Sequence, residues 1–394
     1  MTAVSTDTAT TGAAELLAGY QPGESSLFAS PRGTLLAEGT YFAVPPSGRA
    51  DGHADLARRV GAVLGVAEAA GHEVRTVVGA VPFAPGADAR LIVPQRLRRG
   101  GAPVAVPGRP SPFGIGALRP VPTPGGYRDA VARAVAEIRD GRYTKVVLAR
   151  SLHAEVSGFD PAPVVRALTG RDPGGYTFAV DLGAGRTLFG ASPELLVARH
   201  GRTVTANPLA GSAARSADPV EDRRRAAELL ASAKDRHEHA VVSEQVAEVL
   251  RRYCSSLDAP AEPSLVATAT MWHLSTLITG EIADPAVSAL ELATALHPTP
   301  AVCGTPTPAA REAIGRLEPF DRGFYTGMVG WVDAAGDGEW AVTIRCATAG
   351  PSGIDLYAGA GVVADSDPSA ELAETTAKLG TLLSALGVEN ADVA

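Results

Sequence analysis

The segment YRDAVARAVAEIRDGRYTKVVLAR, residues 127–150, contains both kinds of element from which this fold is built. Between Val131 and Ile138 apolar residues recur at helical spacing, and Gly141 suits the position just after a helix C-terminus. The run KVVLAR at 145–150 is short, apolar and β-branched, which predicts a buried strand. A helix is therefore followed at once by a strand in this part of the chain.

Outward from this segment, strands and helices are mixed without regular alternation. Residues 176–181 and 340–345 are further strand candidates. A longer helix is predicted after the Asp-Pro pair at 218–219, and a last helix after the Asp-Pro pair at 367–368, because Asp is a good N-cap and Pro suits the first helical position. The strands are not separated by regular βαβ crossovers, so the pattern favours an α+β fold over a doubly wound sheet.

Composition limits the classes of partner. The chain has 394 residues and a net charge of −8, so it offers no overall positive field to a nucleic acid. No apolar run approaches the ~18 residues that a membrane span needs, and the N-terminus lacks the features of a signal peptide. We therefore expect a cytoplasmic protein that binds neither nucleic acid nor membrane.

The domain organisation is expected to be simple. Residues 1–20 are rich in Thr, Ala and Gly, which predicts a flexible N-terminus. Residues 21–390 are predicted to form a single domain, and the Pro- and Gly-rich stretch 95–126 to be a long connection inside it.

Two pairs of carboxylates occur at i, i+3 spacing on predicted helices, Asp235 with Glu238 and Glu371 with Glu374. At this spacing both members of a pair share one helix face, and oxygen ligands from two helices suit a hard cation such as Mg²⁺. An exposed acidic face produces the same spacing, and the second pair lies well away from the leucine stripe of its helix. Spacing alone leaves both interpretations open.

Three other features are weak indicators of a ligand. The histidines of the HEH segment at 237–239 point to opposite sides of a helix, so they are not spaced for zinc. The segment GAG at 359–361 is half of a dinucleotide fingerprint, and its glycines suit a close approach of the backbone to a ligand or a neighbouring strand. The three cysteines form no CxxC pair and are expected to be free thiols.

Lys145 and Glu194 are candidates for proton transfer. Lys145 begins an apolar strand, and Glu194 lies in the apolar segment ASPELL at 191–196. A buried lysine is a candidate base, and a buried carboxyl that stays protonated is a candidate acid. A position at a strand edge or on the surface explains either charge equally simply, so the residues alone do not decide.

Taken together, these segments resemble the chorismate-utilising enzymes, a superfamily that includes the isochorismate, salicylate, anthranilate and aminodeoxychorismate synthases. The resemblance covers residues 112–386 strongly. The blocks that carry it occur in the family's order: KVVLAR at 145–150, FGASPELLV at 189–197, NPLAGSAAR at 207–215, LLASAKDRHEHAVV at 229–242, MWHLST at 271–276, LHPTPAVCG at 296–304, LEPFDRGFYTGMVGW at 317–331, GEWAVTIRCA at 338–347, LYAGAGVV at 356–363 and AELAETTAKL at 370–379.

The resemblance implies a fold of two stacked antiparallel sheets surrounded by helices, with a cleft that holds Mg²⁺ and chorismate. It also implies roles for particular residues: Glu238 and Glu374 as direct metal ligands, Asp235 and Glu371 as their water-mediated partners, Arg345 and Lys378 as ligands of the substrate carboxylates, and Gly211 and Gly359 as backbone positions against the substrate.

The same resemblance implies an acid/base reaction. Lys145 would activate a water that attacks ring carbon 2, and Glu194 would protonate the departing 4-hydroxyl, with His273 orienting these groups. Lys145 would have to be neutral and Glu194 protonated, which is the tuning expected of an acid/base pair.

A few residues distinguish the branches of the family. Lys145 stands where ammonia-using anthranilate-type enzymes lack the base, and Ala210 stands where one class of aminodeoxychorismate synthases has a lysine. Salicylate synthases usually have AGT where residues 210–212 are AGS. The chain is thus most similar to the isochorismate synthases of siderophore pathways, whose members suggest a monomer, with salicylate synthase as the alternative.

Two readings from other classes also stay open. A chorismate-binding relative without activity should have lost one of its chemical residues, and Lys145, Glu194, Glu238 and Glu374 are all present. A metal-dependent hydrolase built on the two acidic helices is the interpretation that remains if the family resemblance is set aside.

Overall fold

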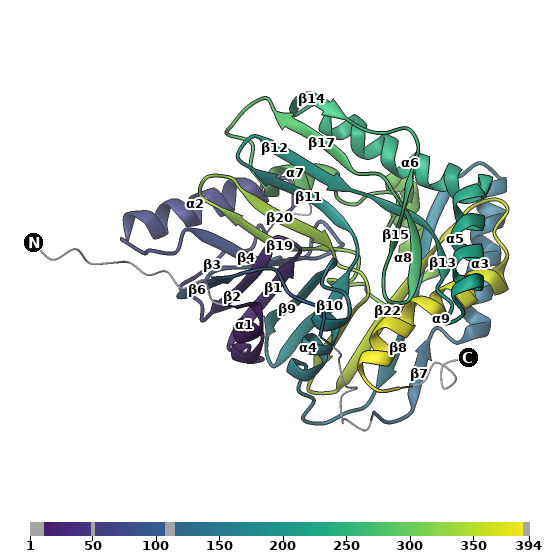
Figure 1. The fold of residues 1–394 in the computed structure, drawn as a ribbon, viewed down its shortest axis with the longest axis horizontal. Helices are drawn as coiled ribbons and strands as arrows, with labels where there is room; N and C mark the ends of the chain where they lie inside the picture. The colour runs from purple at the N-terminus through teal and green to yellow at the C-terminus, as the bar shows by residue number, and fades with distance from the viewer. Residues whose placement is uncertain (1–11, 49–51, 107–114, 389–394) are drawn as a thin grey trace, which may run out of the picture.

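Two large antiparallel sheets lie face to face in the computed structural model, which describes residues 12–48, 52–106 and 115–388 (Figure 1). A small third sheet and the helices surround them. The cluster of apolar side chains between the two sheets includes Phe178 and Val180 from one sheet and Val329 and Ala341 from the other. The expected α+β sandwich is confirmed.

The first large sheet has ten strands, of which β7 pairs with β8 outside the main order. The order is β18 (Gly304–Thr305), β8 (Lys145–Ala154), β22 (Gly353–Val362), β21 (Cys346–Gly350), β10 (Arg186–Ser192), β9 (Tyr176–Gly183), β1 (Ser25–Ser30), β2 (Gly33–Glu38) and β6 (Arg96–Gly100), with β7 at Leu118–Val121.

The second large sheet has nine strands and the third sheet has three. The order in the second is β14 (Cys254–Asp258), β17 (Ile278–Ile282), β12 (Thr203–Asn207), β11 (Leu195–His200), β20 (Gly338–Val342), β19 (Met328–Asp333), β4 (Thr76–Val81), β5 (Arg90–Val93) and β3 (Phe42–Ala43). The third is β13 (Leu209–Ala214), β16 (Met271–Ser275) and β15 (Ser264–Ala267).

Helices contribute to the apolar clusters of both large sheets. Helices α2, α6 and α7 pack with the nine-stranded sheet, and α1, α3, α4, α8 and α9 with the ten-stranded sheet. Their bounds are α1 (Ala13–Gly19), α2 (Leu56–Ala69), α3 (Pro124–Arg139), α4 (Ala162–Arg171), α5 (Pro219–Ala231), α6 (Ala233–Leu250), α7 (Ala289–Leu296), α8 (Thr307–Leu317) and α9 (Pro368–Ala385). None of the helices in these described ranges is long and apolar enough to cross a membrane.

Side-chain caps fix where the functionally important helices begin. The carboxylate of Asp367 accepts from the amides of Ser369 and Ala370 at the start of α9. The region after Asp218 is divided into two helices, because the Ser232 hydroxyl caps α6 by accepting from the amide of Asp235. A capping serine thus sets the register of the first acidic pair.

Two sequence-based expectations are wrong in part. The predicted strand 340–345 ends at Val342, and the chain then passes to the other large sheet, where β21 begins at Cys346. A continuous apolar run does not encode the sheet with which each part pairs, since pairing depends on distant strands.

The expected flexibility of residues 1–20 is wrong for residues 13–20. There α1 forms, and Leu16 and Tyr20 are buried in the core of the ten-stranded sheet, while residues 1–11 lie outside the described part. The stretch 95–126 begins in β6 and ends in β7 and the first residues of α3, although residues 107–114 are not described.

Candidate active site

Two chain segments cross between the large sheets side by side. Residues 193–194 lead from β10 in one sheet to β11 in the other, and residues 343–345 lead back from β20 to β21. The amide of Ala191 donates to the carbonyl of Arg345 and the amide of Val342 to the carbonyl of Glu194, each at 3.1 Å. Glu194 and Arg345, which are 151 positions apart, therefore lie at one crossing.

A cleft at this crossing collects most of the predicted site. Eight predicted site residues line it: Glu194, Gly211, Glu238, His273, Arg345, Gly359, Glu374 and Lys378. Lys145 adjoins the cleft through its ion pair with Glu238, with 2.9 Å between Nζ and Oε1. Asp235 and Glu371 do not line it, but they lie one helical turn before Glu238 and Glu374 on α6 and α9.

The GAG segment leaves room for side chains of the cleft. Gly359 and Gly361 lie on one face of β22 because successive side chains of a strand alternate. A Cβ on Gly361 would lie 2.4 Å from Oε1 of Glu238, and one on Gly359 would lie 2.8 Å from the hydroxyl of Tyr325. The side chains of Glu238 and Tyr325 therefore fill the space beside these glycines, and the approach of a ligand stays a prediction.

Gly211 has a different reason to be glycine. Its φ of +76° is in the left-handed region, and the register of β13 against β16 shifts between Ala210 and Ser212. The bulge directs Ser212 to α9, where its hydroxyl donates to Oε1 of Glu374 at 3.1 Å.

Glu194 is 2 % exposed, and its environment favours the protonated carboxyl. Burial raises its pKa from 4.5 to about 8, although the amide of Leu209 and the charges of Lys145, Lys378 and Arg345 act in the opposite direction. At neutral pH this group can therefore donate a proton, which is the state that a general acid requires.

His273 and Arg345 form a buried contact. Arg345 Nη2 donates to Nε2 of His273 at 3.4 Å, so the ring proton of a neutral His273 resides on Nδ1. Burial, together with the charges of Arg345 and Lys378, lowers the pKa of His273 well below its usual value. Burial also lowers the pKa of Arg345 to about 10, so the guanidinium stays charged at neutral pH.

Three lysines lie against the three glutamates. Besides the pair of Lys145 with Glu238, Lys378 Nζ lies 2.6 Å from Glu374 Oε1 and donates to the carbonyl of Gly359. Lys234 Nζ lies 3.6 Å from Glu371. Each glutamate thus has an ammonium group beside it, which lessens the repulsion between carboxylates.

The carboxylates influence one another's pKa values. Burial and the charge of Glu374 raise the pKa of Glu371 to about 7. Burial also raises the pKa of Asp235, and Glu238 adds to this effect. For Glu374 burial is outweighed by the Lys378 ion pair and the Ser212 hydrogen bond, which hold its pKa below the ordinary value.

The four carboxylates of Asp235, Glu238, Glu371 and Glu374 suit a hard divalent cation, because such ions prefer oxygen ligands and their charge offsets the repulsion between carboxylates. In the described ranges, however, no three His, Cys, Asp or Glu side chains are already grouped closely enough to hold a metal ion. The chemistry of the carboxylates fits Mg²⁺, while in this structure lysines provide the positive charge.

The two histidines of the HEH segment lie in different surroundings. His237 is exposed, whereas His239 is buried and its Nε2 is 2.7 Å from the hydroxyl of Thr276. The three cysteines are free thiols, as expected.

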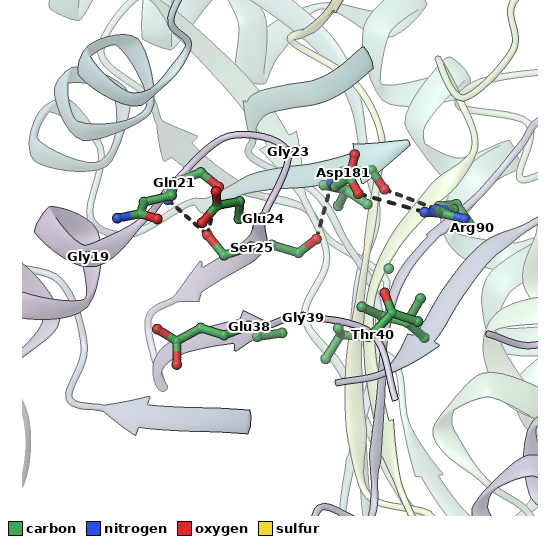
Figure 2. A pocket seen from close by; sticks show the side chains of 16 residues that line it. Gly19, Gln21, Gly23, Glu24, Ser25, Glu38, Gly39, Thr40, Arg90 and Asp181 are labelled. Carbon is green, nitrogen blue, oxygen red and sulfur yellow. Dashed lines mark hydrogen bonds and ion pairs between the residues drawn. The ribbon is translucent and has the colours of Figure 1, made fainter. Parts of the chain in front are cut away.

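A second cavity, of about 390 Å³, lies beside β1, β2 and β5 (Figure 2). Arg90 points to Asp181 there, with 3.7 Å between Nη2 and Oδ2, and Gln21 lies against Ser25. Within the described chain none of the eleven predicted site residues lines this cavity, so it is not part of the candidate active site.

Sequence reasoning assigned no role to Tyr325, Tyr357 and Ser212, although all three line the cleft. The rings of Tyr325 and Tyr357 stack with their centroids 5.1 Å apart. Aromatic residues within the glycine-rich blocks FYTG and YAGAG were the available signal, because a glycine often leaves room for a large neighbour.

Comparison with known proteins agrees with this geometry. The family model described as "Chorismate binding enzyme" matches residues 117–387. The isochorismate synthase DhbC of Bacillus subtilis is 52% identical, over 96% of this chain and 98% of its own. The isochorismate synthase EntC of Escherichia coli K12 is 40% identical, over 84% of this chain and 86% of its own.

A solved structure is also similar. The crystal structure of a putative 2,3-dihydroxybenzoate-specific isochorismate synthase, DhbC from Bacillus anthracis, superposes with a TM-score of 0.89 at 49% identity. The match covers 95% of this chain and 100% of that chain. A family model over residues 117–387 and relatives similar over nearly the whole length lead to one conclusion: the chain belongs to the family of chorismate binding enzymes.

Proposed function

We propose that this protein is an isochorismate synthase, which converts chorismate reversibly into isochorismate. The observation that carries the proposal is the buried Glu194 carboxyl, with a pKa of about 8, in the cleft that Lys145 adjoins and that Arg345 lines. The extensive similarity to isochorismate synthases supports the same reaction.

Substrate binding follows from the cations of the cleft. Chorismate carries two carboxylates, and the cleft offers the guanidinium of Arg345 and the ammonium of Lys378. Arg345 is suited to a bidentate contact because its donors form a planar fork. Gly211 and Gly359 line the same cleft and are the proposed backbone positions against the ring.

The chemical step transfers one proton at ring carbon 2, where water attacks, and one at the 4-hydroxyl, which leaves. Lys145, in its neutral form, takes a proton from the water that attacks ring carbon 2. Glu194 gives its proton to the 4-hydroxyl, which leaves as water while the ring double bonds shift. His273 accepts a hydrogen bond from Arg345 and so keeps its Nδ1–H available to orient the hydroxyl. Such acid and base groups each contribute a rate factor on the order of 10²–10⁴.

Glu238 and Glu374 are the proposed direct ligands of Mg²⁺, and Asp235 and Glu371 the proposed water-mediated partners. When bound, the ion supplies positive charge that fixes a ring carboxylate and offsets the charge of the substrate. Lys145 and Lys378 now lie against Glu238 and Glu374, so both contacts would have to open for these carboxylates to hold the ion.

Other features extend the proposal. Residues 21–390 belong to one catalytic domain, which also includes α1, and the protein works as a cytoplasmic monomer. The product enters the synthesis of 2,3-dihydroxybenzoate and a catechol siderophore, or of salicylate. Two similar proteins support the siderophore branch: the putative 2,3-dihydroxybenzoate-specific isochorismate synthase of Bacillus anthracis, and the vibriobactin-specific isochorismate synthase of Vibrio cholerae, which is 46% identical over 80% of this chain and 80% of its own.

The test is incubation of the purified protein with chorismate, with Mg²⁺ or with EDTA, followed by chromatography and mass determination of the products. We expect isochorismate to form with Mg²⁺ and no isochorismate to form with EDTA. Salicylate and pyruvate as the main products would reassign the protein to the salicylate synthases. The absence of any product under both conditions would refute the proposed activity.

A further inference from the structure

Arg150 is a fully buried cation that the proposed reaction does not use. It lies on β8, the strand that begins with Lys145, and its residue is 0 % exposed. No carboxylate of the described residues forms an ion pair with it, and its Nη1 atom has no hydrogen-bond partner there. Such a group is expensive to bury, because the desolvation of a guanidinium is repaid only by close charge pairing and complete hydrogen bonding.

The partners that Arg150 does have are on α9. Its Nε donates to the hydroxyl of Thr375 at 2.9 Å and its Nη2 to the hydroxyl of Thr376 at 2.5 Å. Both hydroxyls in turn donate to the carbonyl of Leu372, at 2.8 and 2.9 Å. Their protons are therefore committed to the helix, and their lone pairs face the guanidinium.

The position of this contact along α9 connects it to the active site. Thr375 and Thr376 directly follow Glu374, and Lys378 comes two residues later. Along β8, Arg150 and Lys145 are five residues apart, so their side chains leave the strand on opposite faces. One strand thus carries the base on one face and holds the acidic helix from the other.

Stability alone is a poor explanation for Arg150. Replacing a buried charged group by an apolar one of similar volume is often neutral or stabilising. A planar guanidinium, by contrast, can bond two hydroxyls at once. It can thus fix both the rotation of a helix about its axis and its position along that axis.

We propose that Arg150 is a positioning residue, which fixes α9 on β8 and thereby places Glu374 and Lys378 relative to Lys145. The inference rests on the proposed function only for the roles of these three residues. The contact of Arg150 with Thr375 and Thr376 fixes α9 whatever reaction the site performs.

The experiment compares Arg150→Met with Arg171→Met in the full chain. Arg171 is a matched control, because its guanidinium also donates to a hydroxyl of α9, that of Ser384, but far from Glu374. Hydrogen exchange of the amides from Glu371 to Lys378 is measured with α2, which packs with the other large sheet, as the internal reference, together with KM, kcat and the Mg²⁺ concentration for half-maximal activity.

For Arg150→Met we expect faster exchange in this part of α9 and unchanged exchange in α2. We also expect a requirement for about 10-fold more Mg²⁺, because a displaced Glu374 would bind the ion less tightly, and disturbing the support of a metal ligand typically costs at least this much. Arg150→Lys should recover part of the effect, because one ammonium cannot bond both hydroxyls in the same plane. Arg171→Met should match the parent in Mg²⁺ requirement.

Removal of the acceptors provides an independent route, should Arg150→Met fail to fold. The double variant Thr375→Val with Thr376→Val should reproduce the exchange and Mg²⁺ effects. The positioning role of Arg150 would be overturned if this variant, or Arg150→Met, kept wild-type exchange in α9 and a wild-type Mg²⁺ requirement. A uniform rise of exchange in α2 and α9 would also overturn it, because such a rise indicates a general structural role. Inactivity of the parent protein would instead refute the proposed function and leave the exchange comparison valid.

Discussion

The burial of Glu194 decides which group of the site can donate a proton. Its position is set by the crossing of two chain segments rather than by a strand, since β10 ends at Ser192 and β11 begins at Leu195. Three cations act on the carboxyl, yet burial outweighs them and the pKa rises to about 8. Proton donation from Glu194 at neutral pH follows from this balance.

The pH dependence of catalysis should reveal this carboxyl. Because the acid must be protonated, kcat/KM for chorismate should fall as pH rises through about 8, the pKa of Glu194 in the free enzyme. Steady-state rates at saturating Mg²⁺ between pH 6 and 9.5 measure this directly. A kcat/KM that stays level or rises across the whole range would contradict the role of Glu194 as acid.

The same shift predicts a trend in stability. Glu194 ionises near 4.5 in the unfolded chain and near 8 in the folded one, so the folded state binds the extra proton between these values. Its stabilising contribution is complete below pH 4.5 and is lost as pH rises to about 8. Chemical denaturation should therefore show the wild type losing stability relative to Glu194→Gln over this window. A constant difference between the two proteins would argue against the raised pKa.

At the scale of elements, the glycines of β22 and the bulge of β13 bring α6 and α9 to the cleft. Gly361 leaves room for the Glu238 carboxylate, and Gly211 lies where β13 changes register. The acidic pairs were ambiguous in the sequence because helix spacing does not say what faces a helix. Glu371 in particular is 2 % exposed, so of the two interpretations left open the exposed acidic face does not apply to it.

Two glycine substitutions should separate activity from stability. In Gly361→Ala the new methyl group would lie 2.4 Å from Glu238 Oε1 and 3.1 Å from Lys145 Cε, so these side chains must move and turnover should fall at least tenfold. In Gly315→Ala, inside α8, nothing lies within 4 Å, and the helix should gain roughly 0.5–1 kcal/mol of stability with unchanged turnover. Denaturation curves and initial rates of both variants provide the check. Full activity in Gly361→Ala would refute the tight packing of Glu238 against β22.

For the whole molecule, local patterns predicted the elements better than their pairing. The strand at Lys145, the caps at Asp218 and Asp367 and the free cysteines are visible in short windows of sequence. The crossing that unites Glu194 with Arg345 is not, because it depends on strands 151 positions apart that belong to two sheets. The family resemblance singled out these residues as site residues, but only the structure shows that they are in contact. Arg150 was not predicted to be buried because it ends the apolar run 145–150, where an exposed strand end is expected, whereas β8 continues to Ala154.

Metal removal should affect catalysis without unfolding the protein. The apolar clusters of both sheets do not involve the four carboxylates, and lysines already neutralise three of them. EDTA should therefore abolish turnover and change the melting temperature by no more than a few degrees, and added Mg²⁺ should restore activity. Cooperative unfolding in EDTA would mean that the ion is structural, and undiminished turnover would mean that it is not required.

The most direct test of the central claim is the reaction in water enriched in ¹⁸O. If Lys145 activates a solvent water to attack ring carbon 2 while Glu194 releases the 4-hydroxyl, mass spectrometry should find isochorismate with one ¹⁸O atom, located in the 2-hydroxyl group. Isochorismate without the label would show that the hydroxyl moves within the substrate, and it would contradict the acid/base mechanism assigned to this cleft.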